Sequence, residues 1–204
     1  LIRNYEPDIL WNDINYPDKG ETLELFAEYY NKKPDGLVNN RWNVNISDFT
    51  TPEYAQYEEI TPKKWESCRG IAYSFGYNRN SDREHMLSVD ELIDSFVDIV
   101  SKNGNLLLAV GPKADGTIPE IQVARLKALG RWLKTNGEAI FETRPWVTAE
   151  GTTSSGEEVR FTQKDGVIYA ILLSKPRGSQ ITVEKLRPAE DCRITLLGTS
   201  GDLA

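Results

Sequence analysis

Polar and aromatic side chains that could do chemistry stand at the ends of short apolar runs in the sequence. Asp13 follows the run at residues 8–11, Arg41 follows the run at 36–39, and Phe75 follows the run at 70–73. Active sites of α/β folds lie at the carboxyl ends of the strands, so these positions are the first candidates for function. Cleavage of a glycoside requires a carboxylate nucleophile, and aromatic faces with an arginine to hold that carboxylate suit the task.

Glycoside cleavage also requires a second carboxyl group, which donates a proton to the leaving oxygen and later removes one from water. The long polar stretch at residues 43–64 offers four candidates, namely Asp48, Glu53, Glu58 and Glu59. A simpler interpretation stands beside this one, because a single Asp after a strand is often a turn or helix-cap residue. Arg41 can equally be a structural ion-pair partner. The residue types alone therefore indicate a carbohydrate-active α/β chain and leave catalysis open.

The elements that must position these residues follow from the hydrophobic periodicity. Apolar runs predict strands, and stretches with apolar residues three or four apart predict helices. We expect strands at 8–11, 36–39, 70–73 and 106–110, and helices at 21–32, 89–101 and 117–134. Strands that are apolar on both faces are typical of a parallel sheet under helices. Four such strands in about 145 residues predict half of a closed (β/α) barrel, although an open flavodoxin-like sheet also fits the pattern.

From Trp146 onward the period of the apolar residues changes to two. Alternation at 159–162, 181–183 and 192–196, and a continuous apolar run at 167–172, predict antiparallel strands. We therefore expect two domains. Residues 1–145 form the half barrel, and residues 146–204 form a truncated antiparallel β-sandwich segment.

Composition excludes several classes of function. The chain has 24 basic and 31 acidic residues, and this net charge of −7 repels nucleic acid. No apolar run approaches the roughly 20 residues that a membrane-spanning helix needs. The first eight residues do not resemble a signal peptide, which favours a soluble, cytoplasmic protein over a secreted one. A single histidine, His85, excludes a metal site built from several histidines.

Six segments in order resemble the retaining α-L-fucosidases of glycoside hydrolase family 29, in the form found in thermophilic bacteria. The resemblance covers residues 5–173 nearly continuously. The segments read YEPDILWND at 5–13, LVNNRW at 37–42, WESC at 65–68 with FGYNR at 75–79, GNLLLAVGP at 104–112, DGTIP at 115–119 and WLKTNGEAI at 132–140. The resemblance implies the second half of a catalytic barrel, followed by part of a C-terminal β-domain.

The same resemblance assigns roles to individual residues. It makes Asp13 the nucleophile and Glu53 the general acid/base, with Glu66 as the alternative acid/base. Asn40 stands where the family usually has Asp, which affects fine positioning more than the class of chemistry. The residues that it places against the fucose are Trp11, Arg41 and Phe75, the last of them near the C6 methyl group.

The function implied is hydrolysis of terminal α-L-fucosides through a covalent intermediate, with no metal and no organic cofactor. The family's first barrel half, which supplies several sugar-binding histidines, is absent from these residues, so we expect weak activity. His85 is not at a sugar-binding position of the family. The alternative is a non-catalytic, self-associating barrel fragment, because half a barrel exposes two sheet edges that can pair with another chain. Either way we expect a homo-oligomer, unless these residues are a piece of a longer enzyme.

Overall fold

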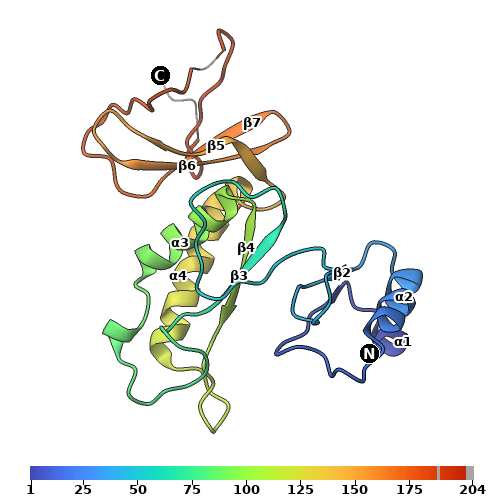
Figure 1. The fold of residues 1–204 in the computed structure, drawn as a ribbon. Helices are drawn as coiled ribbons and strands as arrows, with labels where there is room; N and C mark the ends of the chain where they lie inside the picture. The colour runs from blue at the N-terminus through green and yellow to red at the C-terminus, as the bar shows by residue number, and fades with distance from the viewer. Residues whose placement is uncertain (188, 201–204) are drawn as a thin grey trace.

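The structure is a computed structural model that describes residues 1–187 and 189–200. Figure 1 shows three groups of elements: an N-terminal lobe, a central lobe and a C-terminal sheet. The N-terminal lobe holds α1 (Ile2–Tyr5), β1 (Ile9–Leu10), α2 (Thr22–Lys32) and β2 (Leu37–Val38). The central lobe holds β3 (Trp65–Gly70), α3 (Val89–Ser101), β4 (Gly104–Ala109) and α4 (Glu120–Asn136), with short 3-10 turns at Arg83–His85 and Gly137–Ala139. The C-terminal sheet holds β5 (Arg144–Thr152), β6 (Glu158–Lys164) and β7 (Val167–Leu172).

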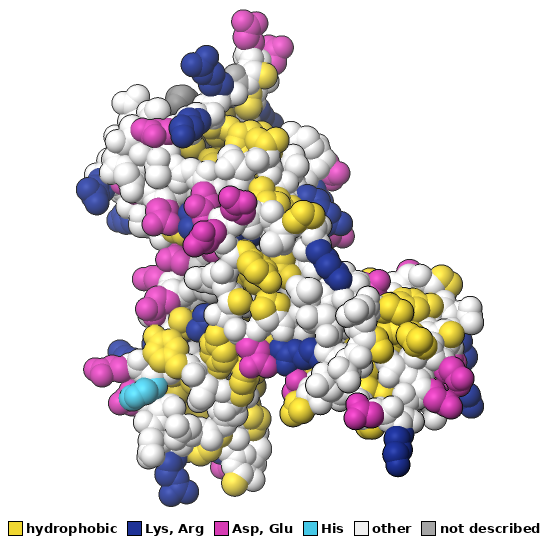
Figure 2. All heavy atoms as spheres, viewed as in Figure 1, with side chains coloured by type: hydrophobic (Ala, Val, Ile, Leu, Met, Phe, Trp, Pro, Cys, Tyr) yellow, Lys and Arg dark blue, Asp and Glu magenta, His cyan; other side chains and the backbone are white. Residues whose placement is uncertain are grey.

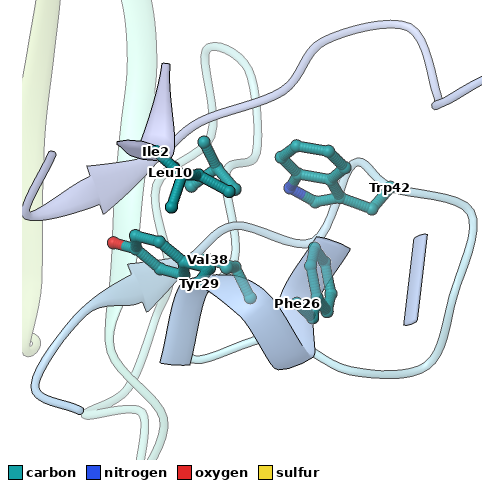
Figure 3. Packing of buried hydrophobic residues seen from close by; sticks show 6 residues of the cluster. All are labelled: Ile2, Leu10, Phe26, Tyr29, Val38 and Trp42. Atoms are coloured by element: carbon teal, nitrogen blue, oxygen red, sulfur yellow. The ribbon is translucent and has the colours of Figure 1, made fainter. Parts of the chain in front are cut away.

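The N-terminal lobe is built on the parallel pair β1–β2, against which α2 packs. Its core consists of Ile2, Leu10, Phe26, Tyr29, Val38 and Trp42, shown in Figure 3. The Tyr29 hydroxyl donates to the Asp8 carbonyl at 2.8 Å and accepts from the Leu37 amide at 3.2 Å. One helix side chain therefore fixes both strands, and with them the two segments that carry Asp13 and Arg41.

The predicted third strand at 70–73 is wrong, because β3 occupies residues 65–70 and ends where that strand was expected to begin. β3 pairs in parallel with β4, from Trp65 opposite Gly104 to Gly70 opposite Ala109. The buried Trp65 ring donates its Nε1 hydrogen to the Lys102 carbonyl at 3.0 Å. The sequence of β3 mixes Trp, Glu, Ser, Cys and Arg, so this buried strand contains no continuous apolar run.

The predicted long loop at 43–64 contains a short extended segment that runs parallel to β3. Thr50 bridges Trp65 and Glu53 bridges Cys68, and the Cys68 amide donates to the Pro52 carbonyl at 3.0 Å. The four parallel strands thus form two separate pairs, β1–β2 and β3–β4, and not the single sheet that we expected. Side chains connect the pairs through this segment, since the Asn40 side chain accepts from the Thr51 amide at 2.9 Å.

The two long helices of the central lobe lie close to the predicted ranges. α3 coincides with the predicted 89–101, and Ser88 begins it with a complete capping box that includes Glu91. Its fully buried Leu92, Val97 and Ile99 form the core-facing stripe. α4 starts at Glu120 because Pro119 is its N-cap residue. No helix in the described ranges 1–187 and 189–200 is long and apolar enough to cross a membrane.

The C-terminal part is one antiparallel sheet in the order β5–β6–β7. Asp165 and Gly166 form its tight turn with positive φ values of 51° and 83°, as a two-residue hairpin requires. The strands predicted at 181–183 and 192–196 are wrong, because the described residues after Leu172 form no strand and contribute only isolated bridges, such as that from Val183 to Thr153. Ile181, Ile194 and Leu196 in these stretches are exposed, and the structure describes no second sheet that covers them. Residues 188 and 201–204 of the predicted second domain lie outside the described residues.

A buried ion cluster joins this sheet to α3. Asp98 of α3 contacts the Arg160 Nε of β6 at 2.6 Å and the Lys102 Nζ at 2.9 Å. Lys102 also contacts Glu150 of β5 at 2.7 Å. Figure 2 shows acidic side chains gathered on the surface where the sheet meets the central lobe. The docking of the sheet therefore depends on two buried cations that offset a local excess of carboxylates.

Candidate active site

One guanidinium group holds two carboxylates together between the N-terminal and central lobes. Arg41 Nη1 lies 2.8 Å from Asp13 Oδ1 and 2.7 Å from Glu53 Oε1. Two oxygens bound to the same nitrogen cannot be farther apart than these two distances together, about 5.5 Å. The two carboxylate side chains are 53% and 48% exposed, so a ligand can reach both. Asp13 and Glu53 lie 40 residues apart in the sequence and meet through Arg41.

Contacts with Thr51 and Trp11 hold the Arg41 guanidinium in place. Its Nε donates to the Thr51 hydroxyl at 2.9 Å, and its Nη2 donates to the buried Thr51 carbonyl at 2.6 Å. Its guanidinium lies over the Trp11 ring, 5.1 Å from the ring centroid. Burial opposes the charged form, but the hydrogen bonds to Asp13 and Glu53 outweigh it and raise the pKa of Arg41. A planar fork fixed in this way presents a permanent positive charge to both carboxylates.

Asp13 is positioned by the turn that follows β1. Ile14 and Asn15 adopt left-handed conformations, with φ of 56° and 64°, and the Ile14 amide donates to Asp13 Oδ1 at 2.9 Å. The buried Asn39 side chain accepts from the Asn12 amide at 3.0 Å and donates to the Asn12 carbonyl at 2.8 Å. Sequence reasoning gave Asn39 no role. The only available signal was a polar residue directly after a buried strand.

Glu66, the alternative acid/base, lies on β3 beside this cluster. Its Oε1 accepts from Trp11 Nε1 at 2.8 Å, so one of its oxygens already orients the tryptophan. Cys68, two residues further along, lies next to the same charges. Burial raises the pKa of the Cys68 thiol and the nearby carboxylates add to the effect, although the positive charge of Arg41 opposes it. The thiol is therefore neutral at the base of the site.

Phe75 is connected to the site by its contact with Tyr54, a residue to which the sequence assigned no role. Its ring packs edge-on against the Tyr54 ring, with 5.0 Å between the centroids, and Tyr54 directly follows Glu53. His85, by contrast, is exposed and its Nδ1 lies 2.8 Å from Asp82. Among the residues that the structure describes, no three His, Cys, Asp or Glu side chains gather so as to hold a metal ion.

The geometry suits a reaction in which two carboxyl groups act at one carbon centre. A separation of about 5–5.5 Å between the two carboxyl groups is typical of retaining glycosidases, in which one carboxylate bonds directly to the sugar. Inverting enzymes leave a wider gap of about 6.5–9.5 Å for a water molecule. The two oxygens that contact Arg41 lie within about 5.5 Å of each other, which is consistent with the closer spacing of double displacement.

Comparisons with known proteins agree on one family. A family model described as alpha-L-fucosidase matches residues 1–138. The tissue alpha-L-fucosidase of Homo sapiens is 36% identical over 216 aligned positions, which cover 100% of this chain and 46% of the relative. A Thermotoga maritima alpha-fucosidase structure in complex with fucose superposes with a TM-score of 0.84 at 49% identity, covering 93% of this chain and 44% of that one. Isoenzyme 1 from Paenibacillus thiaminolyticus gives a TM-score of 0.70 at 31% identity, covering 84% and 44%. The chain spans about half the length of the curated relatives that it matches.

Proposed function

Because the chain belongs to the α-L-fucosidase family, we propose that it hydrolyses terminal α-L-fucosides by double displacement, with Asp13 as nucleophile and Glu53 as acid/base. The matches to the family model and to the curated relatives confirm the resemblance that the sequence motifs indicated. The observation that carries the mechanistic part is the contact of both carboxylates with one Arg41 nitrogen. It supports a carboxyl separation suited to a covalent glycosyl-enzyme.

The proposed reaction has two steps. In the first, an Asp13 oxygen bonds to the anomeric carbon while the bond from that carbon to the leaving oxygen breaks. Glu53 gives its proton to the leaving oxygen, so the leaving group departs as a neutral alcohol. In the second step, water attacks the anomeric carbon and releases Asp13. Glu53 takes the proton from that water, so the enzyme returns to its starting state and fucose keeps its anomeric configuration.

The neighbouring side chains take supporting roles in this proposal. Arg41 keeps the two carboxylates in register, Trp11 lines the sugar site, and Phe75 packs against the sugar near its C6 methyl group. Glu66 is the alternative acid/base, and its hydrogen bond to Trp11 supports a position beside the same sugar. No cofactor enters the scheme, because the bond changes need only two carboxyl groups and water.

We propose that the four parallel strands are part of a (β/α) barrel within residues 1–145, and that residues 146–204 belong to a separate β-domain. The parallel pairing within β1–β2 and within β3–β4 supports the barrel, as does the extended segment 50–53 between the pairs. The change to an antiparallel sheet at Arg144 supports a boundary close to residue 145.

We propose further that these 204 residues self-associate and that their activity alone is weak. In the described part of the chain, β1 and β4 each pair on one side only, and Ile9 and Leu107 on them are 46% and 41% exposed. Such edges favour pairing with a second copy. Carboxylates that are about half exposed exclude water poorly, which weakens the electrostatic stabilisation of charge in the transition state. Light scattering that shows a stable monomer would contradict the assembly.

Turnover of an aryl α-L-fucoside by the purified chain and by Asp13→Ala tests the function. We expect measurable hydrolysis by the unchanged chain and a loss of about 10³-fold or more in the variant, as for removal of other covalent nucleophiles. Asp18→Ala is the matched control, because this exposed aspartate lies five residues away in the sequence and should change little. Absence of turnover in the unchanged chain would favour the non-catalytic alternative. Full turnover by Asp13→Ala would exclude Asp13 as the nucleophile.

A further inference from the structure

We propose that Arg69 is a positioning residue for Glu53, and that it acts through the ring of Tyr54. This inference rests on the proposed role of Glu53 as the acid/base. Arg69 belongs to β3 and is not among the residues that contact Asp13 or Arg41. Its guanidinium lies over the Tyr54 ring, 5.4 Å from the ring centroid, and Tyr54 directly follows Glu53 in the chain.

The backbone next to Glu53 adopts a conformation that must be held in place. Tyr54 has a φ of 52°, in the left-handed region that bulky residues rarely adopt. Just before it, the chain runs beside β3, where the Cys68 amide donates to the Pro52 carbonyl and the Tyr54 amide donates to the Cys68 carbonyl at 3.1 Å. The chain turns away immediately after Glu53. The direction of the Glu53 side chain therefore depends on how firmly Tyr54 is fixed.

Three contacts fix the Tyr54 side chain. Its hydroxyl accepts from the Gly70 amide at 3.2 Å, its ring packs at a steep angle against Phe75, and Arg69 covers its ring. Gly70 has to be glycine for this arrangement. A Cβ there would lie 2.6 Å from the Ser74 carbonyl oxygen and 3.1 Å from the Tyr54 hydroxyl oxygen. The end of β3 is thus built to receive the tyrosine.

Arg69 has no carboxylate of its own among the residues that the structure describes. Its Nε donates to the Gly70 carbonyl at 3.3 Å, and it contributes to the wall of a cavity of about 990 Å³ between α3 and the antiparallel sheet. Burial lowers the pKa of Arg69, which reflects a guanidinium that has given up part of its water without gaining an ion pair. A partly desolvated cation within about 6 Å of an aromatic ring centroid is attracted to the face of that ring. The Tyr54 ring therefore stabilises the Arg69 charge, to which the Glu91 carboxylate adds without forming an ion pair.

The expected consequence is a change in proton transfer by Glu53 and not in binding of the sugar. If Tyr54 shifts, the Glu53 carboxyl moves relative to the leaving oxygen, whereas Asp13 and Trp11, which belong to the segment after β1, stay in place. A misplacement of about 1 Å can cost as much as 10²-fold in rate. A leaving group that departs without protonation does not need the acid, so it should not respond to this shift.

The experiment compares Arg69→Met with Arg69→Lys on two classes of fucoside. On a fucosyl disaccharide, whose leaving group needs the acid, we expect Arg69→Met to lower kcat by roughly 10- to 100-fold with little change in KM. On an activated dinitrophenyl fucoside the first step should change by less than about threefold. Arg69→Lys keeps the cation and should recover most of the disaccharide rate. Arg125→Met is the control, because this α4 arginine likewise donates through Nε to a backbone carbonyl, that of Leu87.

Equal losses on both substrates, or no loss on either, would overturn the inference while leaving the proposed function intact. Absence of turnover in the unchanged chain would instead overturn the proposed function. Hydrogen exchange then tests the contact itself, through the Tyr54 and Gly70 amides. Their exchange should accelerate about tenfold or more in Arg69→Met, since local opening becomes easier. Unchanged protection in that variant would refute the positioning role without any use of activity.

Discussion

Replacing Asp98 by Asn tests whether the buried ion cluster secures the antiparallel sheet to α3. The change keeps the shape of the side chain and removes its charge. In the native protein, Asp98 lies between the Arg160 guanidinium at 2.6 Å and the Lys102 ammonium at 2.9 Å. All three side chains are nearly buried, with 5% to 11% of their surface exposed, so water cannot take the place of the lost carboxylate.

The expected cost follows from what remains around the two cations. Loss of one partner from a buried ion pair typically costs about 3–5 kcal/mol. Here Glu150 still contacts Lys102 at 2.7 Å, and Glu158 still contacts Arg160 at 3.1 Å. Both of these carboxylates are largely exposed and compensate only partly. We therefore expect Asp98→Asn to lower the free energy of unfolding by about 2–3 kcal/mol.

Urea unfolding followed by tryptophan fluorescence measures this change, because Trp146 of β5 packs against Phe161 of β6 and reports on the sheet. With a typical urea dependence of roughly 1–3 kcal/mol per molar, the midpoint should fall by about 1 M.

Asp94→Asn is the matched control, one turn earlier on the same helix and the same chemical change. Burial raises the pKa of Asp94, and the neighbouring Asp90 and Glu158 carboxylates add to the effect. A raised carboxyl pKa in the folded state means that the ionised form destabilises the fold at neutral pH. Removal of this charge should leave the midpoint unchanged or raise it. Equal destabilisation by the two variants, or none by Asp98→Asn, would refute this account of how the sheet is docked.

Two further predictions concern packing and pH. Gly104→Ala should cost about 1–3 kcal/mol of stability in the same urea assay, because its Cβ would meet the buried Trp65 ring at 2.6 Å; no change would show that β4 has room to shift. Hydrogen bonds from Ser155 and Thr153 lower the pKa of Glu157 from 4.5 to about 2, so its stabilising effect is present above pH 4.5 and lost as the pH falls toward 2. Glu157→Gln should therefore flatten that part of a plot of melting temperature against pH, and an unchanged slope would contradict the assignment.

Local patterns were sufficient to predict the long helices. α2 and α3 have clear helical periodicity, and α3 also has its Ser88 cap in the sequence. β3 could not be found in this way, because contacts with Lys102 and with the segment 50–54 make its mixed residues a buried strand. The alternation at 181–196 predicted strands that did not form, since no second sheet is described that covers their apolar side chains.

The site could be predicted by residue type but not by geometry. Asp13 and Arg41 follow strands, so their positions in the sequence were informative. The residues alone could not separate Glu53 from the other carboxylates of its loop, because only the long-range pairing with β3 brings it to Arg41. Asn39, Thr51 and Tyr54 were given no role. Their contributions depend on hydrogen bonds and on one backbone angle that no periodicity encodes.

The most direct test of the central proposal is to trap the covalent intermediate. A 2-fluoro-fucosyl fluoride slows release of the sugar from the enzyme and leaves it attached to the nucleophile, which peptide mapping by mass spectrometry identifies. We predict a single fluorofucosyl label on the Asp13 carboxylate and no label in Asp13→Ala. A label on Glu53, Glu66 or any other side chain, or failure to label at all, would contradict the proposal.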